Sequence, residues 1–230
     1  MRIGIIVAMD KELAGMKAVL TDMSEETDGK FTFCTGILNG RQIIVMKCGI
    51  GKVNAAVGAV EMIHRFHPDY IISSGVAGGI DLGVSVMDVV VADQLVYHDA
   101  YVGEDNEGID IVSPYPVSGF LLKKAKELAE VQEKSGGRKI WIGTICTGEQ
   151  FVTKRSALEG IKQNYPSGLA VDMESCAIAH ACRIMDVPFI SFRIISDTIG
   201  EKANEEQYEN FWTTLADRSF NILQTYIESL

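Results

Sequence analysis

Short apolar segments alternate with amphipathic segments along the whole chain, and this alternation limits the possible folds more than any other sequence feature. The chain opens with Arg2–Ala8, an apolar run of strand length, and continues with Lys11–Leu20, where apolar residues recur at helical spacing. Further β-branched runs predict strands at Tyr70–Ser74, Met87–Ala92, Ile140–Cys146 and Phe189–Ile195. Helical patterns cover Lys52–Phe66, Leu121–Val131, Ser156–Gln163, Ser175–Met185 and Glu205–Leu230. Because near-continuous apolar strands are typical of a sheet covered on both faces, we expect a three-layer α/β/α fold with a central mixed β-sheet.

One antiparallel pair is expected near the N-terminus. Phe31–Leu38 and Gln42–Cys48 are separated by Asn39-Gly40, and this dipeptide favours a two-residue hairpin turn. The 230 residues show no break in composition and no low-complexity stretch. We therefore expect a single domain over residues 1–230.

The charge balance argues against two classes of partner. The chain holds 21 basic and 31 acidic residues, a net charge of -10, and has no basic run that would follow a phosphate backbone. Nucleic acid and anionic membrane surfaces are therefore not expected as partners. No segment reaches the roughly twenty apolar residues of a membrane span, and the N-terminal apolar run is too short for a secretory signal. Five cysteines without a Cys-x-x-Cys pair and four scattered histidines predict a cytoplasmic protein without disulfide or metal.

Glycine is frequent relative to proline, with 22 residues against 5, and several glycines follow predicted strands. Glycine lets the backbone approach a ligand closely. In open α/β sheets, ligands bind beyond the carboxyl ends of the strands. The polar or glycine-rich segments at these ends are Met9–Glu12, Gly49–Lys52, Ser74–Gly79, Thr147–Phe151, Asp172–Glu174 and Ser196–Asp197. We expect all six to face one cavity.

Three carboxylates stand at predicted strand-to-helix junctions. Glu12 opens a helix, where a solvated carboxylate is the simpler interpretation, and Asp172 or Glu174 could merely cap the following helix. Asp197 ends an apolar strand, where a carboxylate needs partners or a raised pKa. Taken together, Glu12, Glu174 and Asp197 suit a reaction that needs a general base, a hydroxyl acceptor and a general acid.

Other motifs favour structural roles. The run Gly75–Gly79 matches neither the dinucleotide-binding fingerprint nor the phosphate-binding loop, so a tight turn and a binding loop both remain open. His98 and Asp99 are adjacent on an extended chain and point to opposite faces, and no Gly-x-Ser-x-Gly elbow accompanies them; we interpret His98 as structural. Tyr208, Phe211 and Trp212 have the spacing of a core-facing helix, although one of them could reach the cavity mouth.

Six motifs in order give the chain a resemblance to a known family. They are Ile3–Ile6 running to Met9-x-x-Glu12, Gly49–Ala56, Ser74–Gly79, Tyr97–Ala100, Val171–Glu174 and Arg193–Asp197. Over its whole length the chain resembles the 5'-methylthioadenosine/S-adenosylhomocysteine nucleosidases of the nucleoside phosphorylase superfamily. The resemblance implies a nucleoside phosphorylase-like fold, a homodimer, and hydrolysis of the N-glycosidic bond of adenine thionucleosides without a metal or organic cofactor.

The resemblance also implies roles for individual residues. Glu12 corresponds to the general base that activates water, and Asp197, helped by Ser196, to the general acid that protonates adenine N7. Glu174 and the backbone of Met173 resemble the clamp for the ribose hydroxyls, and Arg193 is expected to orient the carboxylates around the water. Further contacts to the substrate are expected from Phe151, which stacks on adenine, from the backbone of Val152, from Val76, Ala77 and Gly78, and from Tyr208 over the ribose.

The sequence departs from the family pattern in three places. The aromatic residue over the ribose is displaced by one position, and Tyr208 is the candidate for it. Val76 replaces a serine found in some members, so a side-chain hydrogen bond is lost there. The segment Gly103–Pro116, which in this family shapes the partner's alkylthio pocket, matches weakly. The choice among 5'-methylthioadenosine, S-adenosylhomocysteine, 5'-deoxyadenosine and aminodeoxyfutalosine therefore stays open.

Two other functions fit the sequence less well. Phosphorylases of the superfamily place an arginine where this chain has Ser73 and lack a glutamate matching Glu12, so hydrolysis is favoured. A non-catalytic nucleoside-binding protein would not need the set of three carboxylates.

Overall fold

The computed structural model describes residues 1–103, 111, 113–198, 204–212 and 221–230. The strands in these residues are β1 (Arg2–Val7), β2 (Thr21–Asp28), β3 (Phe31–Leu38), β4 (Arg41–Lys47), β5 (Tyr70–Gly79), β6 (Val89–Tyr97), β7 (Tyr115–Pro116), β8 (Ile140–Thr147), β9 (Gly168–Asp172) and β10 (Phe189–Thr198). The helices are α1 (Asp10–Lys17), α2 (Lys52–Phe66), α3 (Gly119–Lys134), α4 (Arg155–Asn164), α5 (Ser175–Ile184), α6 (Asn204–Asn210) and α7 (Asn221–Ser229).

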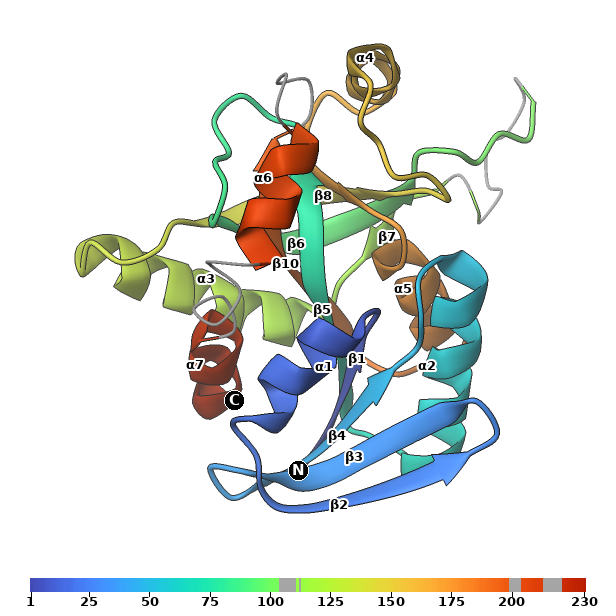
Figure 1. Ribbon diagram of the computed structural model, residues 1–230, viewed down its shortest axis with the longest axis vertical. Helices are drawn as coiled ribbons and strands as arrows, with labels where there is room; N and C mark the ends of the chain where they lie inside the picture. Colours follow the sequence, from blue (N-terminus) through green and yellow to red (C-terminus); the bar gives the residue numbers. More distant parts are fainter. Residues whose placement is uncertain (104–110, 112, 199–203, 213–220) are drawn as a thin grey trace.

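The strands form one mixed sheet in the order β10-β6-β8-β9-β5-β1-β4-β3-β2, with β7 attached to β6. Strand β10 also pairs with β5, so β5, β10, β6, β8 and β9 form a closed ring. Helices α2 and α5 lie side by side on one side of the sheet, and α3 and α7 lie on the other (Figure 1). The expected mixed sheet between two helical layers is confirmed, and the closed ring refines it.

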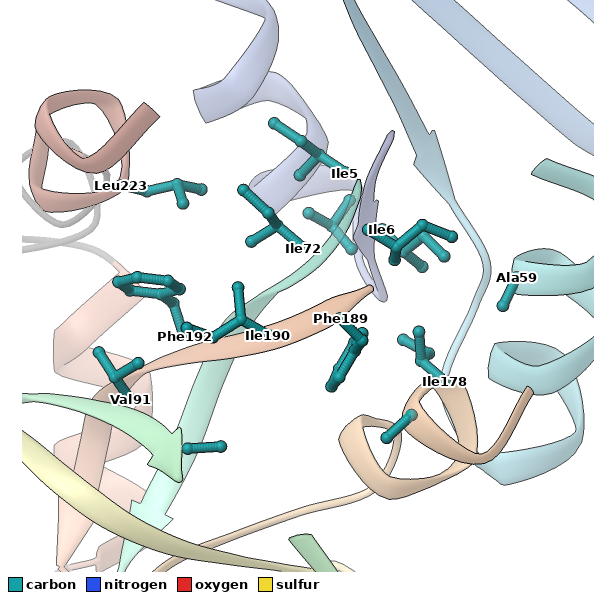
Figure 2. Close-up of a cluster of buried hydrophobic side chains, with 14 of the residues drawn as sticks. Ile5, Ile6, Ala59, Ile72, Val91, Ile178, Phe189, Ile190, Phe192 and Leu223 are labelled. Carbon is teal, nitrogen blue, oxygen red and sulfur yellow. The ribbon is translucent and has the colours of Figure 1, made fainter. Parts of the chain in front are cut away.

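The core lies where the predicted apolar strands cross the middle of the sheet. Ile5 and Ile6 of β1 are fully buried although they point to opposite faces. Figure 2 shows Ile5 and Ile72 on the side of Leu223, and Ile6 on the side of Ile178. Burial of both faces explains the continuous apolar runs, since each such side chain contributes about 1.5–3 kcal/mol.

The N-terminal hairpin is confirmed. Strands β3 and β4 pair antiparallel through a turn in which Asn39 and Gly40 have φ values of 48° and 75°, as a two-residue hairpin requires. Strand β2, which pairs with β3 at the sheet edge, was not predicted. All eight of its residues are exposed and most are polar, so it lacks the apolar alternation that marks a strand.

Two expectations are corrected. Gly75–Gly79 is not a loop: β5 continues through it, paired with β10 and β9. At Gly75 the lack of a side chain is needed, because a Cβ there would lie 2.7 Å from Glu12 Oε1. In place of one helix over Glu205–Leu230, the structure describes α6 against β10 and α7 against α3; residues 213–220 lie outside the described part. None of the helices in the described ranges is long and apolar enough to cross a membrane.

Candidate active site

The predicted segments meet at one cavity, which is open to solvent on one side. Of the residues predicted to act in the site, those lining this cavity are Glu12, Val76, Ala77, Gly78, Phe151, Val152, Met173, Glu174, Ser196, Asp197 and Tyr208. Arg193 lies beneath the lining and is only 2% exposed. The cavity is also lined by Ala8, Met9, Ile50, Gln150, Val171 and Asp172, to which no substrate contact was assigned although most belong to the predicted segments. The carboxyl-end rule was therefore a sufficient guide to the location of the site.

Glu12 is buried, so the interpretation as a solvated carboxylate is wrong. Its Oε2 accepts hydrogen bonds from the N–H groups of Ala8 and Met9, both at 2.9 Å, and its Oε1 accepts one from Val76 N–H at 3.1 Å. Burial raises the pKa of the Glu12 carboxyl, and the charge of Arg193 and the three N–H donors oppose this rise only in part. A fixed carboxylate with a raised pKa has the properties of a general base.

Asp197 is positioned by an irregularity in β10. The register between β10 and β5 shifts between Ile195 and Asp197, which makes Ser196 the extra residue of a bulge. Bulges re-aim side chains, and here both Ser196 and Asp197 line the cavity although they are adjacent in a strand. Ser196 Oγ donates to Asp197 Oδ1 at 2.7 Å and lies 3.3 Å from the carbonyl oxygen of Ala77. The bulge thus presents a buried, oriented carboxyl group to the ligand space.

Glu174 follows β9 and accepts a hydrogen bond from Gly51 N–H, 2.9 Å away, at the N-terminus of α2. Burial, together with the negative charges of Asp172 and Glu12, raises the pKa of Glu174 to about 7, against the opposing effects of Arg193 and Gly51 N–H. Glu174 is the N-cap residue of α5, but its side chain makes no capping hydrogen bond. Asp172 instead accepts hydrogen bonds from the backbone N–H and the hydroxyl of Ser175, the first residue of α5. The Glu174 carboxylate is therefore available to a ligand.

Arg193 does not pair directly with the carboxylates it was expected to orient. Its Nε donates to Asp172 Oδ2 at 2.7 Å and its Nη2 to Ser73 Oγ at 2.9 Å. Its Nη1 and Glu12 Oε1 both lie close to Gly75, at 3.3 and 2.7 Å from the position that a Cβ would take on that glycine. Arg193 therefore acts on Glu12 through its charge across the space that Gly75 leaves free.

Two aromatic rings form a wall of the cavity. Phe151 is 52% exposed, and its ring meets that of Tyr208 edge to face with centroids 5.4 Å apart. Tyr208 Oη reaches Met9 Sδ at 3.6 Å, whereas Phe211 is fully buried in the core. Among the three aromatic residues of this segment, Tyr208 is thus the one at the cavity. An exposed ring beside an apolar wall suits a flat aromatic ligand.

The motif around His98 joins the loops that surround the cavity. His98 N–H donates to the carbonyl of Thr147, and Asp99 accepts from Lys52 Nζ and from Glu149 N–H, each at 2.8 Å. His98 is absent from the cavity lining, and burial lowers its pKa. Its contacts agree with a structural role. No cluster of three His, Cys, Asp or Glu side chains that could hold a metal ion is present among the described residues.

Glu174→Gln is expected to stabilise the protein above pH 7. A carboxyl whose pKa rises from 4.5 to about 7 on folding stabilises the fold below pH 4.5 and loses that contribution as the pH rises to 7, a difference of about 3 kcal/mol. Glutamine keeps an oxygen for Gly51 N–H but carries no charge. Thermal unfolding at pH 8 should show a Tm several degrees higher, whereas Glu133→Gln on an exposed face of α3 should leave it unchanged. A lower Tm for Glu174→Gln at pH 8 would contradict the expectation.

Comparisons with known proteins give a consistent result. The family model described as "Phosphorylase superfamily" matches residues 2–228. The 5'-methylthioadenosine/S-adenosylhomocysteine nucleosidase of Actinobacillus succinogenes is 35% identical over 95% of this chain and 95% of its own length. That of Staphylococcus epidermidis is 34% identical over 99% of this chain and 100% of its own. The nucleosidase of Colwellia psychrerythraea, solved with adenine, superimposes with a TM-score of 0.91 at 33% identity, covering 100% of this chain and 96% of the other. The Neisseria meningitidis enzyme, solved with methylthio-immucillin-A, gives 0.90 at 29% identity, covering 100% and 99%.

Proposed function

Since the chain belongs to the phosphorylase superfamily and, within it, to the 5'-methylthioadenosine/S-adenosylhomocysteine nucleosidases, we propose that it hydrolyses the N-glycosidic bond of these two adenine nucleosides. The observation that carries the proposal is that Glu12 and Asp197, from opposite ends of the sequence, are both buried on one cavity. Binding alone does not require a buried base with a raised pKa, so a non-catalytic role explains the site less well.

The proposed reaction needs one proton acceptor and one proton donor. Glu12 takes a proton from water as the water oxygen bonds to C1' of the ribose. The C1'–N9 bond breaks, its electron pair passes to adenine, and the carboxyl of Asp197 delivers a proton to N7. The transition state carries positive charge on the ribose and negative charge on the purine, so both transfers lower the barrier.

The remaining cavity residues hold the substrate in the proposed complex. Glu174 accepts hydrogen bonds from the ribose hydroxyls, aided by the backbone of Met173, and Tyr208 covers the sugar. Phe151 stacks on adenine. Val152 and the β5 segment Val76–Gly78 offer backbone hydrogen bonds and close approach to the base and the sugar. The N–H group of Val76 donates a hydrogen bond to Glu12, so Val76 also holds the general base in place.

Release of adenine in phosphate-free buffer is the direct test of hydrolysis. Ser73 stands where phosphorylases place an arginine, and it bonds to Arg193. A phosphate dianion bound in place of the attacking water would also be repelled by the buried carboxylate of Glu12. We expect 5'-methylthioadenosine to yield adenine and 5-methylthioribose at a rate that added phosphate does not increase. A strict need for phosphate, with a ribose 1-phosphate as product, would instead identify a phosphorylase.

The preferred 5' substituent is settled by a second assay. The kcat/KM values for 5'-methylthioadenosine, S-adenosylhomocysteine, 5'-deoxyadenosine and aminodeoxyfutalosine rank the substrates, because all four share the adenine and ribose groups. Most of the segment 103–116, expected to shape the partner's 5' pocket, lies outside the described residues. We propose methionine salvage in the cytoplasm as the setting, which the five free, buried cysteines support.

The proposed active form is a homodimer in which the partner subunit covers the mouth of the cavity. Val53 and Val57 lie on one face of α2 and are 75% and 48% exposed. Ile50 lines the cavity just before α2 and is 54% exposed. Tyr101 is 77% exposed and lies two residues after Asp99, which forms an ion pair with Lys52 at the start of α2. Contiguous apolar exposure of this kind marks an interface, and a partner seated here would close the cavity.

Val53→Asp is therefore expected to weaken dimerisation and to raise KM. A charge at the centre of an apolar interface is costly to bury. Sedimentation velocity should show a shift toward monomer together with a higher KM for 5'-methylthioadenosine. The matched change Val131→Asp, at a valine of α3 that is 61% exposed, should alter neither value. A Val53→Asp protein that remains dimeric would place the interface elsewhere.

A further inference from the structure

Asp172 is enclosed by donors from three elements, although the sequence suggested only a helix cap for it. Its Oδ1 accepts from Thr147 Oγ1 at 2.6 Å, and its Oδ2 accepts from Arg193 Nε at 2.7 Å and from Ser175 Oγ. Ser175 N–H lies 3.3 and 3.4 Å from the two oxygens. The Asp172 side chain is 1% exposed. Its oxygens are therefore committed to protein donors, and a substrate hydroxyl would have to displace one of them.

The charges around the cavity are unbalanced. Four acidic side chains line it, Glu12, Asp172, Glu174 and Asp197, and the guanidinium of Arg193 is buried beneath them. Arg193 forms an ion pair with Asp172, and its Nη1 lies near Gly75, as does Glu12 Oε1. In a water-poor site, an arginine whose charge was not offset would favour the ionised forms of all its acidic neighbours.

We propose that Asp172 is a positioning residue that holds and neutralises Arg193 beneath the catalytic carboxylates. Through this pair, Glu12 and Glu174 stay basic enough to take up a proton and to bind hydroxyl groups strongly near neutral pH. The inference rests on the proposed function, because it assigns Asp172 an effect on the same reaction. It differs from a purely structural role in that it concerns charge rather than shape.

The electrostatic effects at these residues agree with that role. Arg193 lowers the pKa values of Glu12 and Glu174, and Asp172 raises that of Glu174. The other titratable groups facing this set are Cys48 after β4, Asp197 of β10 and Tyr208 of α6, with Cys146, Cys176 and His98 near Asp172. Replacing Asp172 by asparagine leaves all of them in place while removing one charge.

The experiment is the pH dependence of adenine release from 5'-methylthioadenosine by the full chain. The acidic limb of kcat/KM reports groups of the free enzyme that must be ionised. In Asp172→Asn the limb should move to lower pH by about one unit, because the charge of Arg193 then acts fully on its neighbours. At pH 7.5, kcat should fall about tenfold, since a weaker base accepts the water proton less readily. Ser175→Ala, which removes one hydrogen bond to Asp172 but no charge, should keep the wild-type limb.

A double variant provides the second test. This variant, Asp172→Asn with Arg193→Gln, removes both charges and avoids an unpaired buried cation, so it serves if the single variant does not fold. Its residual activity should show a limb at or above the wild-type pH. A limb that stays at the wild-type pH in Asp172→Asn, or that falls in the double variant, would overturn the inference. If the wild-type protein released no adenine at all, the proposed function would fail instead.

Discussion

Asp197→Asn should reduce adenine release from 5'-methylthioadenosine by about a hundredfold to ten-thousandfold, the usual effect of removing a general acid. The asparagine is isosteric, and its oxygen can still accept the hydrogen bond that Ser196 Oγ gives to Asp197 Oδ1. The fold and the shape of the cavity should therefore persist, and Tm should change little. What is lost is the proton that adenine N7 needs as the glycosidic bond breaks.

A change of leaving group separates this role from a merely structural one. The 4-nitrophenyl glycoside of 5-methylthioribose releases 4-nitrophenolate, a stable anion, so its leaving group needs little protonation. Asp197→Asn should therefore cleave this compound at close to the wild-type rate while it remains defective on the nucleoside. An equal loss on both compounds would assign Asp197 to sugar binding or folding. Ser196→Ala is the milder comparison, because it removes the orienting hydroxyl but keeps the acid.

Much of the fold was predictable because burial leaves a direct mark on sequence. The apolar run of β1 reflects a strand covered on both faces, and Lys52–Phe66 was predicted with the bounds that α2 has. Strand β2 escaped because exposed edge residues carry no such mark. The glycines of Gly75–Gly79 predicted a turn or a binding loop after the strand, whereas β5 continues through them and Gly75 leaves room for Glu12 and Arg193.

The location of the site was predictable, but its internal contacts were not. The ends of β1, β5, β9 and β10 carry the residues that the carboxyl-end rule selects, and these do line one cavity. The contacts that tune them join residues far apart in sequence, such as Gly51 with Glu174 and Asp172 with Arg193. No local pattern reports such pairs, and the bulge at Ser196 follows from strand register rather than from composition.

Glu12→Gln should cause a loss of similar size, about a hundredfold to ten-thousandfold, for a different reason. The amide cannot take a proton from water. It also cannot satisfy its surroundings, because both oxygens of Glu12 accept backbone N–H groups and a glutamine offers one oxygen. Either orientation of the amide turns its NH2 group toward a backbone donor, which costs about 1–3 kcal/mol and is partly offset by removing a buried charge. We therefore expect a modest change in Tm beside the large loss of activity.

The two carboxylate variants should respond oppositely to chemical rescue. Azide is a nucleophile that needs no base, and the neutral glutamine no longer repels an anion from the water site. Azide should restore turnover by Glu12→Gln with formation of a ribosyl azide, while the nitrophenyl compound should not. Asp197→Asn should show the reverse, since its base is intact and its acid is missing. If azide had no effect on Glu12→Gln and the nitrophenyl compound restored it, the roles of the two carboxylates would have to be exchanged.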